Sequence, residues 1–306
     1  MQQRHPLRLL KLAEYNWLRE MPELASSSRL RPVSGTQNAL VKELRQAFSQ
    51  GQAVDNLCAI EGIRLIEEAI RSRLKIQTLF VRESARVKAQ RILEQLTKHA
   101  DAVLLPDRVF DSAVLTEHPQ GIAALVKIPG HDLQSLFHVA PALVIVAAAI
   151  QDPGNFGTLI RSAEAFGATS AVGIEGTVNH WNPKTVRASA GSIFRLPVLK
   201  TSTMELLAEL QNRQVRALAL VAPHGNGGSA IGDGSSPRSP LRLQDADLVG
   251  PCALFVGNEG AGVSRELLTH MEQFVAIPQT RVESLNAGVA ASIALYEAQR
   301  QRSAAR

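Results

Sequence analysis

The sequence predicts an α/β protein in which strands alternate with helices, with a parallel sheet in its second half. Two observations lead to this prediction. Short apolar runs bounded by Gly, Pro, Asn or Asp alternate with longer amphipathic stretches, the pattern of strand–helix units. Several runs in the second half are apolar at every position, as strands buried on both faces of a parallel sheet require. The 306 residues suffice for two domains of about 100–200 residues each.

The first half of the chain predicts a compact α/β domain behind a basic extension. The apolar spacing of residues 1–30 fits an amphipathic helix. We expect the N-terminal extension over 1–32, the domain over 33–128, and a linker over 129–141 that begins with a Pro-Gly pair. The elements expected in this domain are strands at 57–60, 78–81, 103–105 and 122–126 and helices at 38–48, 63–71, 84–99 and 109–115.

The second half predicts another α/β domain over 142–306. Its first run, 142–149, is apolar enough for a central parallel strand. We expect the next helix to begin near Phe156, and Asn155 is a candidate N-cap because its side chain can accept a hydrogen bond from a first-turn amide. The elements expected here are strands at 142–149, 170–174, 197–199, 215–221, 253–256 and 275–277 and helices at 156–166, 184–191, 204–213 and 287–302.

One long segment of this domain, 223–247, predicts a flexible loop. It is rich in Gly, Ser and Pro and has no apolar period. Gly225, Gly227 and Ala230 fit the G-x-G-x-x-A pattern of dinucleotide-binding proteins, but that pattern needs a helix directly after it. The residues that follow, up to Pro237, are rich in Gly and Ser and are not expected to form a helix. The fingerprint is therefore rejected, and the missing helix argues against the competing hypothesis of a nucleotide-dependent Rossmann enzyme.

The charge and composition of the chain limit the kinds of partner that it can have. The net charge is +5, and residues 1–50 carry 8 Lys and Arg against 4 Asp and Glu. A basic leading segment suits a polyanion such as RNA, although the charge alone favours the simpler interpretation of a solvated helix face. Cys58 and Cys252 lie among apolar neighbours, which predicts buried thiols in a reducing compartment. No Cys/His spacing predicts a metal, and no run of about 18 apolar residues predicts a membrane span, so we expect a cytoplasmic protein.

Two loops near the C-terminus follow apolar runs. Three glycines within 257–262 follow the run 253–256, and bare backbone there lets a ligand approach main-chain N–H and C=O groups. The run 275–277 ends at a proline, and after the next loop Ser284 or Asn286 suits the cap of the last helix. Loops at the carboxyl ends of neighbouring strands form the crevice in which open α/β sheets bind ligands.

Each candidate side chain at these strand ends also has a plain structural interpretation. Arg161 lies six residues after Asn155; it can reach a ligand at the helix start or lay its stem over apolar surface. Glu259, between glycines, can bind a ligand or be a solvated loop charge. Ser284 and Asn286 can be caps or ligands. Taken singly, none of these residues identifies a chemistry.

Taken together, three ordered segments resemble the motifs of a known family. The segments are N-F-G-x-x-x-R at 155–161, L-F-V-G-N-E-G-x-G-V-S at 254–264 and I-P-x-x-x-x-E-S-L-N-x-x-x-A at 277–290. They resemble the three motifs of the TrmH (SpoU) branch of the SPOUT RNA 2′-O-ribose methyltransferases. The first half, in segments 38–44, 60–62 and 119–122, resembles the L30e-like substrate-binding domain that many members carry.

The resemblance implies a fold, a cofactor and partners. The C-terminal domain is expected to be a parallel α/β sheet tied in a deep trefoil knot, one of the few exceptions to the rule against knots. It is expected to bind S-adenosylmethionine in the loops of the second and third motifs, to form a homodimer through this domain, to act on structured RNA and to need no metal. The residues that the resemblance assigns to the cofactor are Leu254, Gly257, Asn258, Glu259, Gly260, Ile277, Leu285 and Asn286.

The same resemblance assigns Asn155, Arg161, Glu259, Ser284 and Asn286 to methyl transfer onto a ribose 2′-hydroxyl. The family gives Arg161 the role of base or activator. Because an arginine is not deprotonated in proteins, we prefer Arg161 as the positive charge that favours the alkoxide or binds the adjoining phosphate, and the proton acceptor stays open. Asn155 is expected to position the ribose, with Ser284 and Asn286 framing the methyl site.

For the RNA, we prefer large-subunit rRNA to tRNA. An L30e-like domain suits a kinked or looped rRNA element, and short tRNA-specific relatives lack that domain. A tRNA is the alternative substrate, and a non-catalytic RNA-binding or ribosome-assembly protein that keeps the fold is the alternative class. The intact Asn155, Arg161, Glu259 and Asn286 argue against a non-catalytic protein.

Overall fold

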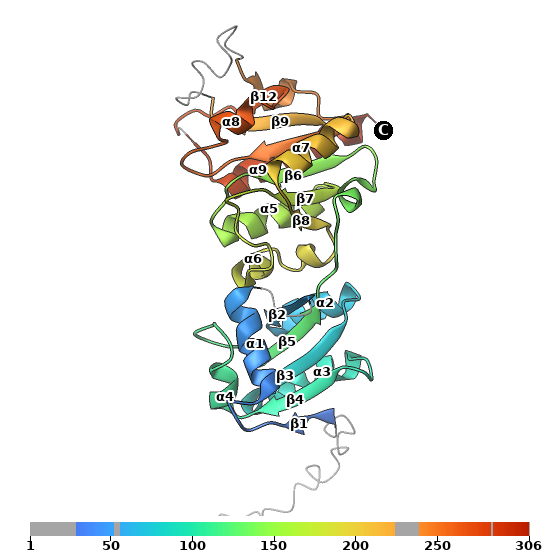
Figure 1. Cartoon of the computed structure of the whole chain (residues 1–306), viewed down its shortest axis with the longest axis vertical. Coiled ribbons are helices and arrows are strands. Elements are labelled where there is room, and N and C mark those ends of the chain that lie inside the picture. The colour runs from blue at the N-terminus through green and yellow to red at the C-terminus, as the bar shows by residue number, and fades with distance from the viewer. Residues whose placement is uncertain (1–28, 52–55, 224–238, 283, 306) are drawn as a thin grey trace, which may run out of the picture.

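Two separate β-sheets organise the chain, one in each half. The computed structural model describes residues 29–51, 56–223, 239–282 and 284–305. Figure 1 shows the two sheets stacked along the long axis of the molecule, the first at the bottom and the second at the top. Both are combined with helices, so the predicted α/β class is confirmed. The helix expected over 1–30 lies almost wholly outside the described residues.

The first sheet has five strands in the order β1-β4-β3-β5-β2. β5 is antiparallel to both of its neighbours, whereas β1, β4 and β3 are parallel. The elements are β1 Arg31–Pro32, α1 Ala39–Gln50, β2 Leu57–Glu61, α2 Ile63–Arg71, β3 Ile76–Arg82, α3 Arg86–Gln95, β4 Asp101–Leu105, α4 Asp107–Asp111 and β5 Ile122–Lys127. Every strand and helix predicted in this half is present, and the two-residue β1 is an addition.

The second sheet has seven strands in the order β10-β12-β9-β11-β6-β7-β8, and every neighbouring pair is parallel. The elements are β6 Leu143–Ala147, α5 Pro153–Ala165, β7 Ser170–Gly173, α6 Pro183–Ala188, β8 Val198–Lys200, α7 Thr203–Asn212, β9 Arg216–Val221, β10 Leu241–Arg242, β11 Cys252–Val256, α8 Arg265–Leu268, β12 Gln273–Ala276 and α9 Ala287–Ala304. Because β11 lies between β6 and β9, the loops after these strands meet at one edge of the sheet.

Small residues bring the helices of the second half close together. A methyl group at Gly157 of α5 would lie 2.5 Å from the Cβ of Ala188 in α6, so only glycine fits there. α9 packs on the other side of α5, where Ser162 and Ser292 share a hydrogen bond of 2.7 Å. Nearer the start of both helices, a methyl group at Gly288 of α9 would lie 3.2 Å from Thr158 of α5. The starts of α5 and α9 therefore lie side by side at the edge of the sheet that carries the loops.

The start of α5 differs from the prediction. The helix begins at Pro153, and the N-cap is Asp152, whose side chain accepts a hydrogen bond of 2.7 Å from the backbone N–H of Asn155. The interpretation of Asn155 as the N-cap is therefore wrong. Asp is as good a cap as Asn, and proline is favoured at the first helical position. The side chain of Asn155 is left available for other contacts.

The flexible loop expected over 223–247 needs a correction in its last part. Residues 224–238 lie outside the described residues. Residues 239–247 are not a free loop, because β10 pairs with β12 and the short 3₁₀ helix Leu243–Asp245 follows. Leu243 and Ala246 are buried. Two isolated apolar anchors show no period, so the sequence pattern did not reveal this packing.

The linker expected over 129–141 is docked onto the second sheet. Its 3₁₀ helix Gln134–Phe137 buries Leu136 completely. The carbonyl oxygen of Leu136 accepts hydrogen bonds from the hydroxyl groups of Thr169 at 3.2 Å and Ser170 at 3.1 Å. The domain boundaries and the knot stay predictions.

Candidate functional site

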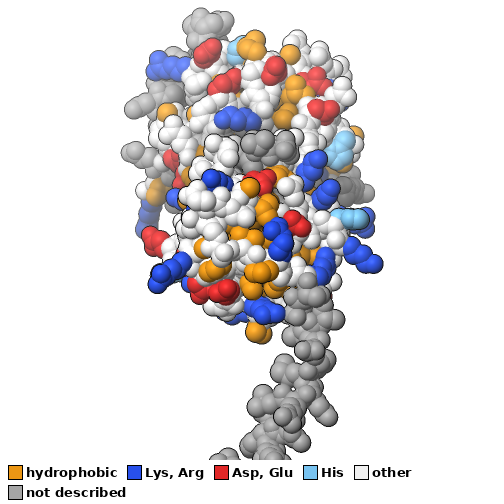
Figure 2. Space-filling view, turned by 60° about the horizontal axis from the view of Figure 1, so that its bottom comes forward, with side chains coloured by type: hydrophobic (Ala, Val, Ile, Leu, Met, Phe, Trp, Pro, Cys, Tyr) orange, Lys and Arg blue, Asp and Glu red, His pale blue; other side chains and the backbone are white. Residues whose placement is uncertain are grey.

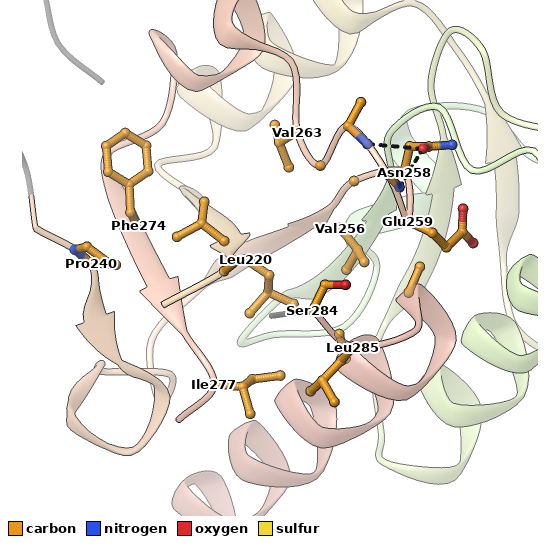
Figure 3. A pocket seen from close by; sticks show the side chains of 18 of the residues that line it. Leu220, Pro240, Val256, Asn258, Glu259, Val263, Phe274, Ile277, Ser284 and Leu285 are labelled. Atoms are coloured by element: carbon orange, nitrogen blue, oxygen red, sulfur yellow. Dashed lines mark hydrogen bonds between the residues drawn. The ribbon is translucent and has the colours of Figure 1, made fainter. Parts of the chain in front are cut away.

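A pocket of about 470 Å³ opens at the carboxyl ends of β9, β11 and β12. In Figure 3, the loop after β11 lies on one side of it and the residues before α9 on the other. Small-molecule sites have volumes of about 300–1,000 Å³, so the pocket is large enough for a nucleoside. The lining residues are Leu220, Val221, Ala222, Pro240, Val256, Gly257, Asn258, Glu259, Gly260, Ala261, Gly262, Val263, Arg265, Leu268, Phe274, Ile277, Gln279, Ser284, Leu285, Ala287 and Ala290.

The loop after β11 closes on itself. The backbones of Asn258 and Gly262 exchange hydrogen bonds of 3.1 and 2.8 Å, and the Asn258 side chain accepts one of 2.9 Å from the N–H of Gly260. A methyl group at Gly257 would lie 2.0 Å from the carbonyl carbon of Gly262. The loop itself therefore requires glycine at 257, before any ligand is considered. At Gly260 the nearest atom to an added methyl group is 3.6 Å away, so this position leaves room.

The opposite side of the pocket is apolar. Figure 3 shows the side chains of Leu220, Val256, Ile277 and Leu285 around one space, with the hydroxyl group of Ser284 between them. They come from the ends of β9, β11 and β12 and from the start of α9. The pocket thus combines an apolar surface with a loop that offers backbone donors and acceptors, the combination typical of a small-molecule site.

Asn155, Glu259 and Asn286 form one hydrogen-bond network beside the pocket. The Asn155 side-chain N–H donates to Glu259 Oε1, 104 residues further along the chain. The Asn286 side-chain N–H donates to Asn155 Oδ1 at 2.8 Å. Asn286 Oδ1 accepts from the N–H of Val289 at 3.2 Å and so caps α9. The three segments that carry the candidate residues therefore meet at one place.

Arg161 is not part of this network. It lies exposed on α5 and does not line the pocket. Within the described part of the chain it has no hydrogen bond or ion pair, so its guanidinium is free to bind a partner. The neighbouring Ser162 contacts α9, which places Arg161 beside the α5–α9 contact rather than at the bottom of the pocket.

The predicted cofactor residues divide into two groups. Gly257, Asn258, Glu259, Gly260, Ile277 and Leu285 line the pocket. Leu254 does not, because it lies fully buried inside β11, and Asn286 lies just outside in the network. Of the remaining candidates, Ser284 lines the pocket and Asn155 touches it through Glu259.

Sequence reasoning missed several lining residues, of which Gln279 carries the clearest chemistry. Its Oε1 is buried and has no hydrogen-bond partner among the described residues. A buried acceptor without a partner costs about 1–3 kcal/mol, which a ligand donor in the pocket can offset. A polar side chain two residues after the β12 run was the available signal. Leu220 and Phe274 were missed because their strands read only as core.

Neither a metal-binding cluster nor a membrane-spanning helix is found in the part of the chain that the structure describes. Among these residues, no group of three or more His, Cys, Asp and Glu side chains is arranged to hold a metal ion. Within the same residues, no helix has the length and apolar character needed to cross a membrane.

Comparison with known proteins agrees with this fold. Residues 142–296 match the SpoU rRNA methylase family model, and residues 38–124 match the model of the MRM3-like substrate binding domain. The chain is 30% identical to the Bacillus subtilis 23S rRNA (guanosine(2553)-2′-O)-methyltransferase RlmP over 87% of this chain and 98% of that protein. It is 29% identical to the Streptomyces viridochromogenes 23S rRNA (uridine(2479)-2′-O)-methyltransferase over 79% of this chain and 82% of that protein.

A solved structure supports the same grouping. The SpoU methyltransferase AviRb from Streptomyces viridochromogenes, in complex with the cofactor AdoMet, aligns with a TM-score of 0.74 and 25% identity over 88% of this chain and all of that one. Together, the fold and these matches define a methyltransferase with two α/β halves. The chain belongs to the SpoU rRNA methylase family.

Proposed function

We propose that this chain transfers the methyl group of S-adenosylmethionine to a ribose 2′-hydroxyl of large-subunit rRNA. The network of Asn155, Glu259 and Asn286 is the observation that carries the proposal. It joins the three segments that define the family resemblance at the mouth of a pocket large enough for the cofactor. Asn155 and Glu259 are partly buried and Asn286 is exposed, so the network lies where a bound substrate can reach it.

The residues present fit S-adenosylmethionine. The apolar side chains of Ile277 and Leu285 suit the adenine, the backbone of 257–262 offers donors and acceptors, and the unpartnered Oε1 of Gln279 suits an amino group. When bound, S-adenosylmethionine supplies an electrophilic methyl group on a positively charged sulfur. Glu259 is the acidic side chain of the lining, and it lies at the end of the pocket where the network begins.

Methyl transfer needs the ribose hydroxyl in line with the methyl group, and it needs stabilisation of the charge that develops on oxygen. Asn155 is fixed by hydrogen bonds at both ends of its amide, so it is preorganised to position the ribose beside Ser284. Arg161 always carries a positive charge. It supplies that charge to the developing alkoxide or to the adjoining phosphate.

Arg161 reaches such a position most readily in a homodimer. The exposed side of α9 carries Val289, Ile293 and Tyr296, which are 46%, 36% and 53% exposed. These residues lie at helical spacing on one stripe, next to the α5 helix that carries Arg161. Burying this stripe against a second copy brings Arg161 to the edge of an enclosed site. The dimer is therefore part of the proposal.

The first half of the chain is proposed to bind the rRNA, with domains at 33–128 and 142–306. The match to a substrate binding domain over 38–124 supports this role, as do the names of the two relatives, both of which act on 23S rRNA. Because its proposed substrate is ribosomal RNA, the protein is proposed to act in the cytoplasm.

The test is to map 2′-O-methyl sites in total RNA from cells with and without the chain. We expect a missing mark in large-subunit rRNA; a loss confined to tRNA, or no loss, contradicts the proposal.

A further inference from the structure

A second pocket, of about 390 Å³, lies where the two halves of the chain meet. Most of its residues come from the first half of the chain. Two come from the second half: Arg187 from α6 and Ala190 from the turn just after it. We propose that this pocket binds an unpaired RNA nucleotide together with its phosphate. The inference rests on the proposed function, because it names the part of the RNA that is held away from the methyl-transfer site.

The two halves are packed tightly around this pocket. A methyl group at Gly191 would lie 2.8 Å from the Cβ of Glu68 in α2. Arg195 spans the junction: it donates to Glu164 of its own half and to Glu68 at 2.9 Å and Ser72 at 3.1 Å in the other. Hydrogen bonding to Glu164 raises the pKa of Arg195 above its ordinary value. The shape of the pocket is thus fixed before RNA binds.

The acidic side chains of the pocket already have partners. Glu61 accepts hydrogen bonds from the hydroxyl group of Thr116 and from the backbone N–H of Gln120 at 3.2 Å. Glu68 is paired with Arg71 and Arg195. Their negative charge is therefore partly offset within the protein.

The basic side chains of the pocket have fewer hydrogen-bond and ion-pair partners among the described residues. Within the part of the chain that the structure describes, Arg187 makes a single hydrogen bond, of 3.3 Å, to Thr116 Oγ1. Arg64 has no ion pair or hydrogen bond with the rest of the described chain. Both are exposed. Arginine binds phosphate with two parallel N–H donors. α2 begins beside them after Gly62, which has no side chain to cap the helix, and the N–H of Ile63 donates to Gln120 Oε1 at 3.4 Å. The positive end of the α2 dipole also favours an anion there.

The remaining lining suits a base. His118 offers a ring for stacking and Leu65 an apolar contact, while Gln120 offers an amide for a base edge. Proteins read single-stranded RNA by stacking unpaired bases and hydrogen-bonding their edges. Figure 2 shows that positive and negative side chains alternate over the face of the first half seen there. Among the described residues on that face, no broad basic patch is seen that could bind RNA in place of the two arginines.

The test compares two double variants. Arg64→Ala/Arg187→Ala removes the two guanidinium groups of the pocket that form no ion pair among the described residues. Arg86→Ala/Lys88→Ala removes the same charge from exposed positions of α3, outside the pocket. The probes are a fluorescein-labelled pool of random ten-nucleotide single-stranded RNAs and a duplex of equal length, with binding followed by anisotropy. Unfolding of each variant is checked by circular dichroism.

We expect the pocket variant to bind the single-stranded pool about tenfold more weakly than the wild type, and the α3 variant within about twofold. The slope of log K against log salt should fall by about 0.7 for each phosphate that the variant no longer binds. Equal binding by the two variants would overturn the proposal, as would wild-type binding of duplex as tight as that of single strands.

A cofactor titration of the same proteins separates this test from the proposed function. Normal S-adenosylmethionine binding with undiminished RNA binding refutes the pocket alone, whereas no cofactor binding with the expected weakening refutes the methyltransferase alone.

Discussion

The side-chain amide of Asn155 donates a hydrogen bond to the carboxylate of Glu259, and the two residues are 104 positions apart in the chain. The contact is matched in type, because the amide N–H₂ only donates and an ionised carboxylate only accepts. Asn286 holds the other end of the same amide at 2.8 Å. The orientation of Asn155 is thereby determined by both of its neighbours.

An exchange of these two groups tests the contact. Asn155→Asp places a second carboxylate against Glu259, and we expect methyl transfer to fall by about 100-fold, since loss of a hydrogen bond to a charged group costs about 1.5–3 kcal/mol. Glu259→Gln keeps an acceptor in the same shape and should lose much less. The double variant Asn155→Asp/Glu259→Gln restores a donor facing a carboxylate and should recover at least about tenfold over Asn155→Asp. A double variant no better than Asn155→Asp would show that the contact has no role in turnover.

Gly257 and Gly260 form a matched pair in the loop after β11. Gly257→Ala forces the loop open, because the added methyl group meets backbone at 2.0 Å, whereas Gly260→Ala meets nothing closer than 3.6 Å. Overpacking of this kind costs about 1–3 kcal/mol. We expect calorimetry to show S-adenosylmethionine binding weakened at least about tenfold by Gly257→Ala and within about threefold for Gly260→Ala. Similar affinities for the two variants contradict the described loop.

Local sequence predicted the strands and the loops that form the site. The runs at β6 and β11 are apolar throughout because both faces of these central strands are covered. The same property left one difference unpredicted. Because apolar and polar residues do not alternate along β11, nothing in the sequence distinguishes Leu254, which is buried inside the strand, from Val256, which borders the pocket. The two-residue strands β1 and β10 are too short to show any period.

The direction of Asn155 was not predictable from local sequence. Asp152, Pro153 and Asn155 are all favoured near a helix start, and only the position of Glu259 in space shows which of them faces the pocket. The pocket between the halves was missed for a similar reason. Arg64 and Arg187 are far apart in sequence, and each resembles an ordinary surface arginine until the fold brings them together.

The exposed apolar stripe of Val289, Ile293 and Tyr296 on α9 predicts that the protein is a homodimer. Val289→Asp/Ile293→Asp places charges in the proposed interface, so light scattering should show the mass of one chain for this variant and of two chains for the wild type. Val249→Asp is the control, because Val249 is 38% exposed but does not belong to the stripe. A monomeric wild type that transfers methyl groups would remove the dimer from the account.

Because the pKa of His180 is lowered in the folded chain, we expect the protein to be less stable in mild acid. Burial, followed by the positive charges of Lys200 and His131, lowers the pKa of His180 from 6.5 to about 4, and its Nδ1 has no partner among the described residues. The unfolded chain takes up a proton near pH 6.5 while the folded chain does not. The free energy of unfolding therefore falls as the pH drops through 6.5, by about 2 kcal/mol at pH 5. Urea unfolding at pH 7 and pH 5 should show a smaller fall for His180→Gln; parallel falls contradict this assignment.

Arg161 allows the central claim to be tested in one measurement. The assay follows the transfer of a tritium-labelled methyl group from S-adenosylmethionine to deproteinised large-subunit rRNA and locates the label by its protection of the neighbouring phosphodiester from alkali. Because Arg161 lies outside the cofactor pocket, Arg161→Ala should bind S-adenosylmethionine within about threefold of the wild type. We expect the wild type to label a ribose 2′-oxygen and Arg161→Ala to lose at least about 100-fold in rate, roughly 2.7 kcal/mol of transition-state stabilisation. Label on a base, no label with the wild type, or wild-type turnover by Arg161→Ala would contradict the account.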